Sequence, residues 1–532
     1  MNDSEQDVEK TLKKEGKGRD GMMKSVSMVS ALTMLSRVSG LIRDVIVASI
    51  FGTSMGADAF FVAFKIPNFM RRLFAEGAFA QAFVPVLTEY KTTRTHDEVQ
   101  ELVNYVAGAL SLILGLLTIV AVLAAPIVII VFAPGFTSEP DKLHLAGEML
   151  RLTFPYLMLI SLTAFAGSIL NSYGRFAVPA FAPVILNICL IGCALWLSPL
   201  MIEPANALAW GVLMAGVLQL LLHLPFLARI RLLPIPSFSL SHLRQHEGVR
   251  RIITLMVPAM FGVSVSQINL LLDTVLASFL VTGSVSWLYF SDRLVELPLG
   301  VIGIALATVI LPSLSEKHTN QSPQAFAKTL DWAMRVVLLI GVPAAVALFV
   351  LAEPILAVLF QRGAFGAHDV AMAAQSLRAY TVGLLAFMLI KVLAPGYYAR
   401  QDIKTPVKIG IKAMVANMIL NLLLIGPLAH AGLALATSIA AFLNAGWLLM
   451  GLRRQGVFFF QPGWPLFLLR LLIATSAMVG VLFWLWEDMQ QWLAWGLFDR
   501  VWHMTLMIFV GTSAYVGVLY VLGVRRRHIM GR

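Results

Sequence analysis

The sequence of 532 residues contains little charge, since only 13% of its residues are Asp, Glu, Lys or Arg, against about 25% in soluble proteins. Hydrophobic residues make up 58%, and the mean hydropathy is +0.81. These values exclude a soluble globular protein and indicate an all-α chain that crosses a membrane many times. The net charge of +11 would suggest a nucleic-acid partner in a soluble protein. In a membrane protein it reflects basic cytoplasmic loops, so no nucleic acid is expected.

Cysteine and the common catalytic motifs are scarce as well. Cys189 and Cys193 lie one helical turn apart in an apolar run, which suits buried small hydrophobes better than a disulfide. The sequence has no G-x-x-x-x-G-K-[ST] motif for ATP, no H-E-x-x-H and no histidine cluster with metal-ligand spacing. Long loops that would hold a catalytic domain are also missing. The sequence therefore predicts a transporter, not an enzyme, with energy drawn from a gradient or from the substrate side.

Fourteen apolar runs are long enough to span a bilayer, which takes about 20 residues per helix. They cover 25–51, 58–88, 103–133, 146–171, 178–198, 205–228, 249–280, 285–314, 326–352, 368–397, 406–427, 431–452, 465–486 and 501–523. Residues 1–24 form a polar segment with no apolar run, so we expect a cytoplasmic tail and no cleaved signal. Lys and Arg collect in every second loop and near both termini, which predicts that both ends are cytoplasmic.

Short matches recur along the chain in the same order. "PVLTE" at Pro85 returns as "PSLSE" at Pro312, and "DVIVAS" at Asp44 resembles "DTVLAS" at Asp273, offsets of 227 and 229. "LNICLIG" at Leu186 returns as "LNLLLIG" at Leu420, an offset of 234. These matches predict two six-helix lobes of equal orientation facing a central cavity, a transporter architecture. The predicted domains are the tail 1–24, the lobes 25–228 and 249–452 with a cytoplasmic linker 229–248 between them, and two extra helices with a basic end in 453–532.

Charged residues fall inside the predicted first, second and eighth spans. A charge at the centre of a membrane helix costs about 2.5–3.5 kcal/mol, so such residues usually face a protein interior or a wet cavity. The basic residues outnumber the acidic ones, which favours an anionic ligand; the alternative is a set of structural ion pairs, such as Arg43 with Asp58 or Arg71 with Glu76. We expect gating or structural roles for Asp58, Arg72, Glu76, Asp292 and Glu296, and for Pro67, which interrupts the second span.

Four segments carry a resemblance to a known family: "MLSRVSGLIRD", "ADAFFVAFKIPNFMRRLFAEGAFAQAFVPVLTEY", "GSVSWLYFSDRLVELPLGVIGIALATVILPSLS" and "KVLAPGYYARQDIKTPVKIG". The chain from about residue 25 to 525 resembles the MurJ/MviN family of lipid II flippases, within the superfamily of multidrug, oligosaccharidyl-lipid and polysaccharide exporters. The resemblance implies a cationic cavity between two lobes, with the last two helices forming a groove for a lipid tail. It also implies a place in the bacterial inner membrane and a part in cell-wall synthesis and cell shape.

The resemblance further implies that undecaprenyl-pyrophosphate carrying the peptidoglycan subunit, lipid II, crosses from the inner to the outer leaflet by alternating access. The important cavity arginines of the family fall on Arg37, Arg43, Arg71 and Arg293. Arginine suits phosphate because its planar fork donates two parallel hydrogen bonds. Asp58 matches an acidic position near the outer gate, and Glu296 follows Arg293 as in the family pattern. Other proteins of cell-wall synthesis and division are expected as partners.

A cation site in the second lobe is a further expectation, because some family members bind sodium there. Asp273, Asn417, Asn421 and Thr437 lie on the matching helices and offer oxygen ligands, which suit a hard cation. The alternatives are polar helix-packing contacts in place of sodium, with the membrane potential as the driving force. For the protein as a whole, the alternatives are a flippase for another polyprenyl-linked oligosaccharide, of the O-antigen type, a membrane enzyme of polyprenyl-phosphate metabolism, and a scaffold without transport.

Overall fold

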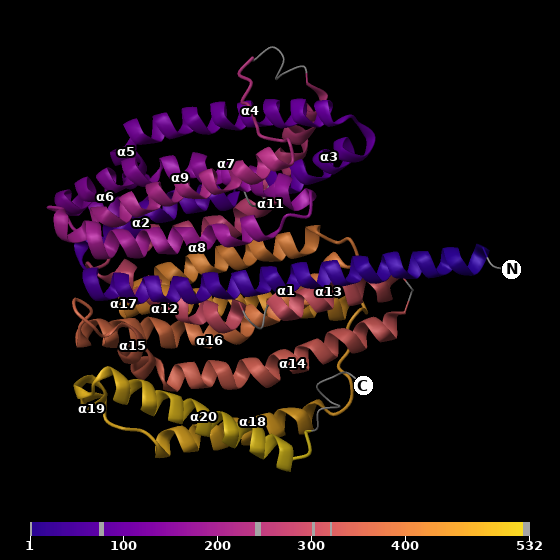
Figure 1. Cartoon of the computed structure of the whole chain (residues 1–532). Helices are drawn as coiled ribbons and strands as arrows, with labels where there is room; N and C mark the ends of the chain where they lie inside the picture. The colour runs from indigo at the N-terminus through magenta and orange to yellow at the C-terminus, as the bar shows by residue number, and fades with distance from the viewer. Residues whose placement is uncertain (1–2, 74–78, 240–245, 301–303, 320–321, 525–532) are drawn as a thin grey trace. The chain divides into compact units, whose positions relative to one another are not determined.

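A computed structural model describes residues 3–73, 79–239, 246–300, 304–319 and 322–524 (Figure 1). Within these ranges the chain forms helices and turns, and no β-strand occurs there. The all-helical class predicted from the apolar runs is confirmed. The chain divides into two compact units, and the division inside α11 falls between residues 267 and 268. The predicted linker at 229–248 lies earlier in the chain, and the predicted domain ranges stay a prediction.

The first unit comprises residues 1–47, 62–132 and 139–267. Its helices are α1 (Asp3–Phe51), α2 (Met55–Arg71), α3 (Ala80–Thr93), α4 (His96–Leu123), α5 (Ala125–Phe132), α6 (Pro140–Thr153), α7 (Pro155–Ser172), α8 (Ala177–Gly192), α9 (Asn206–Arg229) and the first part of α11 (Glu247–Ala277). Its core holds Phe83 of α3, Val103 of α4 and Ile169 of α7, all fully buried. These three helices therefore present their apolar stripes to one another.

The second unit comprises residues 48–61, 133–138 and 268–532, so it includes the end of α1 and the start of α2. Its elements are η2 (Pro134–Ser138), the end of α11, α12 (Ser284–Pro298), α13 (Ile304–Thr319), α14 (Pro323–Val350), α15 (Ala352–Phe360), α16 (Ala367–Tyr398), α17 (Lys404–Arg454), α18 (Trp464–Trp484), α19 (Met489–Ala494) and α20 (Leu497–Val521). Helix α16 packs against α12, α14 and α17. A separate core around Leu351, Leu482, Trp492 and Met507 joins α18, α19 and α20 to α14 and α15.

Breaks in the helices explain why several predicted spans correspond to two shorter helices. The span 103–133 is divided at Ala124 into α4 and α5, and the span 146–171 at Phe154 into α6 and α7. Pro155 occupies the first position of α7, where its missing N–H is tolerated. The span 178–198 ends in a π-helical segment, η3 (Cys193–Leu197), and the short η4 (Ser198–Leu200) follows. Cys189 and Cys193 are free and buried, as the sequence predicts.

Helix α17 is two helices that meet at a reversal. Ala429 has a non-helical backbone with φ 46° and ψ −128°, just after Pro427. A Cβ on Gly432 would lie 2.3 Å from the carbonyl oxygen of Leu424, although residues eight apart in a straight helix are about 12 Å apart along the axis. The chain therefore reverses its direction here, so the two predicted spans 406–427 and 431–452 run antiparallel, as the turn sequence between them indicates.

Nine helical segments of the described residues are long and apolar enough to cross a membrane, by length and composition. They lie within α4, α6–α7, α8–η4, α9, α14, α16, α17, α18 and α20. The predicted fourteen exceed these nine by five, because α17 counts once and because α1, α2, α11 and α12 are not among the nine; α2 and α12 have only 17 and 15 residues and carry charges. The chain is therefore a multi-pass membrane protein, and the number fourteen stays a prediction.

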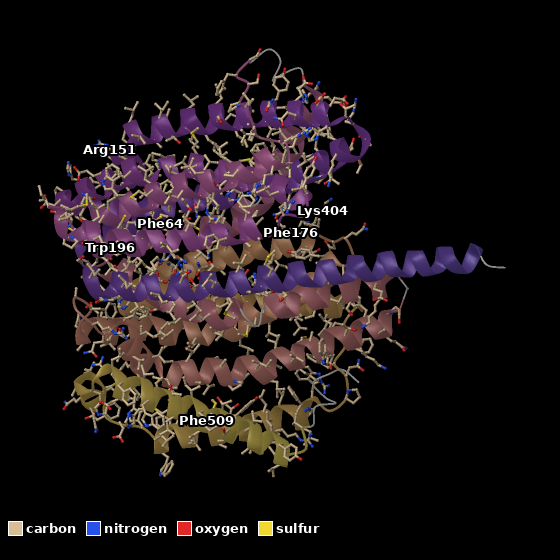
Figure 2. The ribbon with its side chains drawn as sticks, viewed as in Figure 1. Phe64, Arg151, Phe176, Trp196, Lys404 and Phe509 are labelled. Atoms are coloured by element: carbon tan, nitrogen blue, oxygen red, sulfur yellow. The ribbon has the colours of Figure 1, made fainter. Side chains whose placement is uncertain are left out.

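Apolar side chains on the outside of these helices agree with a lipid environment. On α4, Leu116, Ile119 and Leu123 follow one helix face and are 59–78% exposed. Figure 2 labels Phe509 of α20 and Trp196 beyond α8, which are 69% and 76% exposed. A soluble protein rarely exposes rows of such side chains. The segment before the first span is helical too, because α1 begins at Asp3 and continues without a break to Phe51 (Figure 1).

The chain between α9 and α11 packs back onto α3 and α4 within the first unit. Asn104 of α4 accepts a hydrogen bond from the backbone N–H of Ile235. His246 lies 5.0 Å from the ring of Tyr105 and 6.4 Å from that of Tyr90, between ring centroids. Burial lowers the pKa of His246 below its usual value, and the carboxylates of Glu101 and Glu247 oppose that shift. The neutral imidazole is thus the form that this packing favours.

Candidate functional site

Arg43 of α1 is held in a buried network inside the first unit. Its Nε and Nη2 donate to Asp44 Oδ1 at 2.9 and 2.6 Å, and its Nη1 donates to Asn187 Oδ1 of α8 at 3.0 Å. Arg43 and Asp44 are only 5% and 4% exposed. Asn187 in turn donates to Ser39 Oγ and to the Ser36 carbonyl, so it joins α8 to two turns of α1. Arg43 therefore forms an ion pair with its neighbour Asp44, and its contacts favour a structural role.

Arg37 lies six residues before Arg43 on the same helix, which is about 9 Å along the axis. Its side chain is partly exposed. Among the residues that the structure describes, it has no hydrogen-bond or ion-pair partner. Of Arg37 and Arg43, Arg37 is thus the one with its guanidinium available to a ligand.

The next two arginines lie at the end of α2 and directly after it. Arg71 is partly buried and its Nε donates to Asn68 Oδ1 at 3.2 Å, while Arg72 is exposed. Pro67 lies inside α2 and is buried. The helix continues for about one turn beyond the proline and ends at Arg71. Glu76, for which a gating or structural role was predicted, lies outside the described residues, as do all of residues 74–78.

Helix α12 of the second unit places Arg293 one turn from Glu296. Arg293 Nη1 donates to Glu296 Oε2 at 2.9 Å, and these side chains are 37% and 45% exposed. The guanidinium also lies 5.6 Å from the centre of the Tyr289 ring, within cation–π range. Asp292 is partly buried on the same helix. Half-exposed ion pairs contribute little stability, so Arg293 is able to exchange Glu296 for another anion at small cost.

Asp58, at the start of α2, caps the first turn of α12 within the second unit. Its Oδ2 accepts from the Gly283 N–H at 2.8 Å, and its Oδ1 accepts from the Ser286 N–H and hydroxyl at 3.0 and 2.6 Å. Asp58 is 1% exposed. A carboxylate satisfies free N–H groups at a helix N-terminus and complements the helix dipole. Gly283 has φ +98°, a conformation that glycine adopts without strain.

A second carboxylate strengthens the same region. Asp369 at the start of α16 accepts at Oδ1 from the Thr53 hydroxyl at 2.5 Å and from Trp287 Nε1 at 3.0 Å. The Ala364 N–H also donates to the Ser49 carbonyl oxygen at 2.8 Å. The sequence analysis identified Asp58 but missed Asp369, because nothing in the sequence links residues 53 and 369. The turn between α1 and α2 is thus fastened to α12 and α16 by side chains from three segments.

The four residues of the predicted cation site come together on α11 and α17. Asn421 Nδ2 donates to Asp273 Oδ1 at 2.8 Å, Asn417 Nδ2 reaches the same oxygen at 3.4 Å, and the Thr437 hydroxyl donates to Asp273 Oδ2 at 3.3 Å. Asn417 and Asn421 are fully buried, and within the part of the chain that the structure describes their Oδ1 atoms have no hydrogen-bond partner. Asn269, one turn before Asp273, accepts from Asn417 at 2.7 Å and was missed by the sequence analysis.

The repeat relates this cluster to the network on α1 and α8. Asp273 matches Asp44 at an offset of 229, and Asn421 matches Asn187 at an offset of 234. In each unit the asparagine contacts the helix that carries the aspartate. In the first unit Arg43 lies between the two groups, whereas the residue at the offset of 229 from Arg43 is Leu272. The second unit therefore has the same acceptors without the internal guanidinium.

Comparison with known proteins relates these features to one family. The family model "Lipid II flippase MurJ" matches residues 47–502. The "Probable lipid II flippase MurJ" of Vibrio cholerae is 48% identical over 96% of this chain and 97% of the relative. The "Lipid II flippase MurJ" of Burkholderia cenocepacia is 41% identical over 96% of this chain and 99% of the relative.

Solved structures give the same answer. The chain matches the structure "Lipid II flippase MurJ, inward closed conformation" with a TM-score of 0.79 and 28% identity, over 93% of this chain and 98% of that one. A multidrug transporter of the MATE family and MOP superfamily, at 16% identity and a TM-score of 0.66, shares the fold alone. Since the family model covers most of the sequence and the relatives extend along nearly all of it, this helical chain with arginines inside α1, α2 and α12 belongs to the MurJ family of lipid II flippases.

Proposed function

We propose that the protein translocates lipid II from the inner to the outer leaflet of the bacterial inner membrane, for cell-wall synthesis. The observation that carries this proposal is the near full-length similarity to relatives that are named lipid II flippases. Only the headgroup needs a polar path, because the undecaprenyl tail is stable in the hydrocarbon of either leaflet. Other cell-wall synthesis and division proteins are the proposed partners. The protein is a transporter and not an enzyme.

The proposed ligands of the pyrophosphate are Arg37, Arg71 and Arg293. Each is partly exposed, and the hydrogen bonds that Arg71 and Arg293 make to Asn68 and Glu296 are of a kind that an anion can replace. Charge-assisted bonds from arginine to phosphate are shorter and stronger than those between neutral groups. Arg43 has a positioning role. Its contacts with Asp44 and Asn187 hold α1 against α8, and the position of α1 determines where the side chain of Arg37 lies.

We propose that transport follows alternating access between two six-helix lobes of a fourteen-helix chain, with both termini in the cytoplasm. The contacts of Asp58 with the start of α12, and of Asp369 with Thr53 and Trp287, would form the outer gate. Opening that gate requires the backbone N–H of Gly283 and Ser286 to exchange the carboxylate for water. The apolar faces of α18 and α20 form the proposed groove for the lipid tail, and exposed Leu472 and Phe509 support this.

Sodium is the proposed coupling ion, bound by Asp273, Asn417, Asn421 and Thr437, with the membrane potential as the alternative driving force. The residues fit a hard cation, because the buried Oδ1 atoms of both asparagines accept no hydrogen bond from any described residue and lie on side chains that contact Asp273. A bound sodium ion would supply the positive charge that Arg43 supplies to Asp44 in the first unit. Asp273 holds the negative charge at this position, and the amides and the hydroxyl provide neutral oxygens.

The experiment that tests the function is depletion of the protein in cells that carry a rescuing variant. With Arg37→Ala or Arg293→Ala, we expect lipid II to accumulate on the inner leaflet, as measured by its accessibility to an external label. Arg94→Ala is the matched control, since Arg94 makes an exposed pair with Glu98. Near-normal outward movement of lipid II in both variants would refute the assignment of these arginines. Loss of lipid II synthesis would instead indicate an enzyme, and accumulation of another polyprenyl-linked oligosaccharide a related flippase.

A further inference from the structure

A basic pocket of about 300 Å³ opens beside the first turns of α18, entirely within the second unit. We use the term basic pocket for the cavity lined by Arg335, Val336, Leu339, Pro462, Gly463, Leu466, Phe467, Arg470 and Val524. Its walls come from the first half of α14, the start of α18 and the residue that follows α20 by three positions. Two arginines and no carboxylate line it, and the remaining side chains are apolar.

Arg335 is fixed in place at one side of the basic pocket. Its Nε donates to Asp331 Oδ2 at 2.9 Å, and its Nη2 donates to the carbonyls of Gln461 and Pro462 at 3.2 and 3.0 Å. Asp331 also accepts from the Gln461 N–H and from Trp464 Nε1. Arg335 thus forms an ion pair with Asp331, whose other carboxylate oxygen accepts from Gln461 and Trp464, and the guanidinium is held in place.

Gly463 leaves room in front of this guanidinium. It has φ +92°, and a Cβ there would lie 3.9 Å from Arg335 Nη1. The Arg335 guanidinium also lies 5.1 Å from the centre of the Trp464 ring, which orients its plane. Nη1 has no hydrogen-bond partner among the residues that the structure describes, so it remains a donor toward the basic pocket.

Arg470 faces the basic pocket from α18. It lies six residues beyond Trp464, about 9 Å along the helix. Its side chain is partly buried, and the described residues offer it no hydrogen-bond or ion-pair partner. The neighbouring Leu466, Leu469 and Leu472 are 52–64% exposed and form an apolar surface on the same helix. A cation placed beside such a surface is unfavourable unless an anion or water reaches it.

The position in the chain indicates the side of the membrane. Arg453 and Arg454 end α17 shortly before this pocket, and the sequence continues after α20 with Arg525, Arg526 and Arg527. Basic residues gather on the cytoplasmic side, where anionic lipids attract them. Basic pockets between membrane helices on that side are a known type of site for phospholipid headgroups.

We propose that the basic pocket binds the phosphate of an anionic phospholipid, a lipid that is not transported. Arg335 and Arg470 donate to the phosphate oxygens, and the acyl chains lie along exposed Leu466 and Leu469 of α18. A free phosphate ion would leave the apolar walls formed by Val336, Leu339 and Phe467 without a partner. The bound lipid joins α14 to α18, so it stabilises the α18–α20 pair on the rest of the second unit.

The test measures lipid binding to the purified full-length protein in detergent by native mass spectrometry. Phosphatidylglycerol is expected to bind more tightly than phosphatidylcholine, and Arg470→Gln is expected to weaken phosphatidylglycerol binding about fivefold, equivalent to about 1 kcal/mol. Arg400→Gln is the matched control, because Arg400 bonds Gln455 at the end of α17 and does not line the basic pocket. Binding in that variant is expected to match the unmodified protein.

Three outcomes would overturn the proposal. One is equal binding of the two phospholipids by the unmodified protein, a result that does not depend on the folding of any variant. Another is an unchanged affinity in both Arg470→Gln and Arg335→Lys protein whose thermal stability is normal. The third is displacement of phosphatidylglycerol by inorganic phosphate or by lipid II at equal concentration, which would assign the basic pocket to a free anion or to the transported lipid. Failure of lipid II transport would leave all three measurements unaffected.

Discussion

Replacing Arg43 by alanine should destabilise the first unit, even though Arg43 belongs to the set of arginines that the family resemblance assigns to the substrate. The substitution removes three hydrogen bonds to Asp44 and Asn187. It leaves the Asp44 carboxylate, which is 4% exposed, beside an empty space with a negative charge. The same change at Arg37 removes no hydrogen bond or ion pair among the described residues, so it should affect substrate binding and leave stability intact.

The expected magnitude follows from the burial of the pair. Breaking a buried ion pair by removing one partner costs about 3–5 kcal/mol, because the remaining charge stays desolvated. For a unit of this size each kcal/mol lowers the Tm by about 2–4 °C, so Arg43→Ala should lower it by roughly 6–20 °C. Arg43→Met combined with Asp44→Leu removes both charges and should recover most of that loss. Arg94→Ala, in an exposed pair, should cost about 1 kcal/mol or less.

The assay is thermal unfolding of the purified protein in detergent, followed by near-ultraviolet circular dichroism, for the four variants and the unmodified chain. A Tm for Arg43→Ala within about 2 °C of that for Arg37→Ala would refute the structural role of Arg43. A double variant that is less stable than Arg43→Ala alone would show that other partners of Asp44 contribute more to stability than Arg43 does.

Three further predictions concern other parts of the chain. Asp58→Asn removes a charge-assisted bond to the Gly283 N–H, so hydrogen exchange in the first turn of α12 should rise by roughly 10- to 100-fold; unchanged exchange by mass spectrometry would contradict the capping role. Replacing choline by sodium should raise the Tm of the unmodified protein, because sodium at 100 times its Kd adds about 2.7 kcal/mol to the free energy of unfolding. Leu272→Arg should abolish that shift, because a guanidinium then lies beside Asp273. Burial lowers the pKa of His246, so the folded state favours its neutral form. The stability that its packing contributes is complete above the unfolded pKa of about 6.5 and is lost as the pH falls below it. The linker that contains His246 should therefore lose protection from proteolysis between pH 8 and 5.5, and a loss that persists in His246→Gln would disprove the assignment.

The sequence predicted the class, the polytopic character and the family because these depend on local composition and on long ungapped motifs. The family resemblance placed Asp273, Asn417, Asn421 and Thr437 at one site, and their side chains contact one another, whereas their role as cation ligands stays a prediction. The reversal at Ala429 was visible as a polar, proline-containing interruption between two apolar runs. Each of these features is a property of residues near one another in the chain or of a repeated pattern.

The partners of the charged residues were harder to predict. Arg43 forms an ion pair with its neighbour Asp44 at 2.6 Å, a contact that the sequence analysis does not single out, because rotamer and burial decide which nearby carboxylate a guanidinium contacts. Asp369 acquires its role from Thr53 and Trp287, which are 316 and 82 residues away. Such distances in sequence leave no periodicity or spacing for a single chain to reveal. The breaks at Ala124 and Phe154 likewise depend on tertiary packing, with only a nearby proline as a local signal.

The contrast between Arg43 and Leu272 implies two different kinds of thermodynamic dependence within one chain. A guanidinium that is part of the polypeptide cannot dissociate, so the charge balance at Asp44 is the same in every medium. At Asp273 the residue equivalent to Arg43 is Leu272, and the sodium ion that we propose there would come from solution. Its occupancy would follow mass action and vary with the ion concentration on the side to which the cluster is open. Under this proposal the charge at Asp44 is balanced by a covalent part of the chain, whereas the charge at Asp273 depends on the composition of the surroundings.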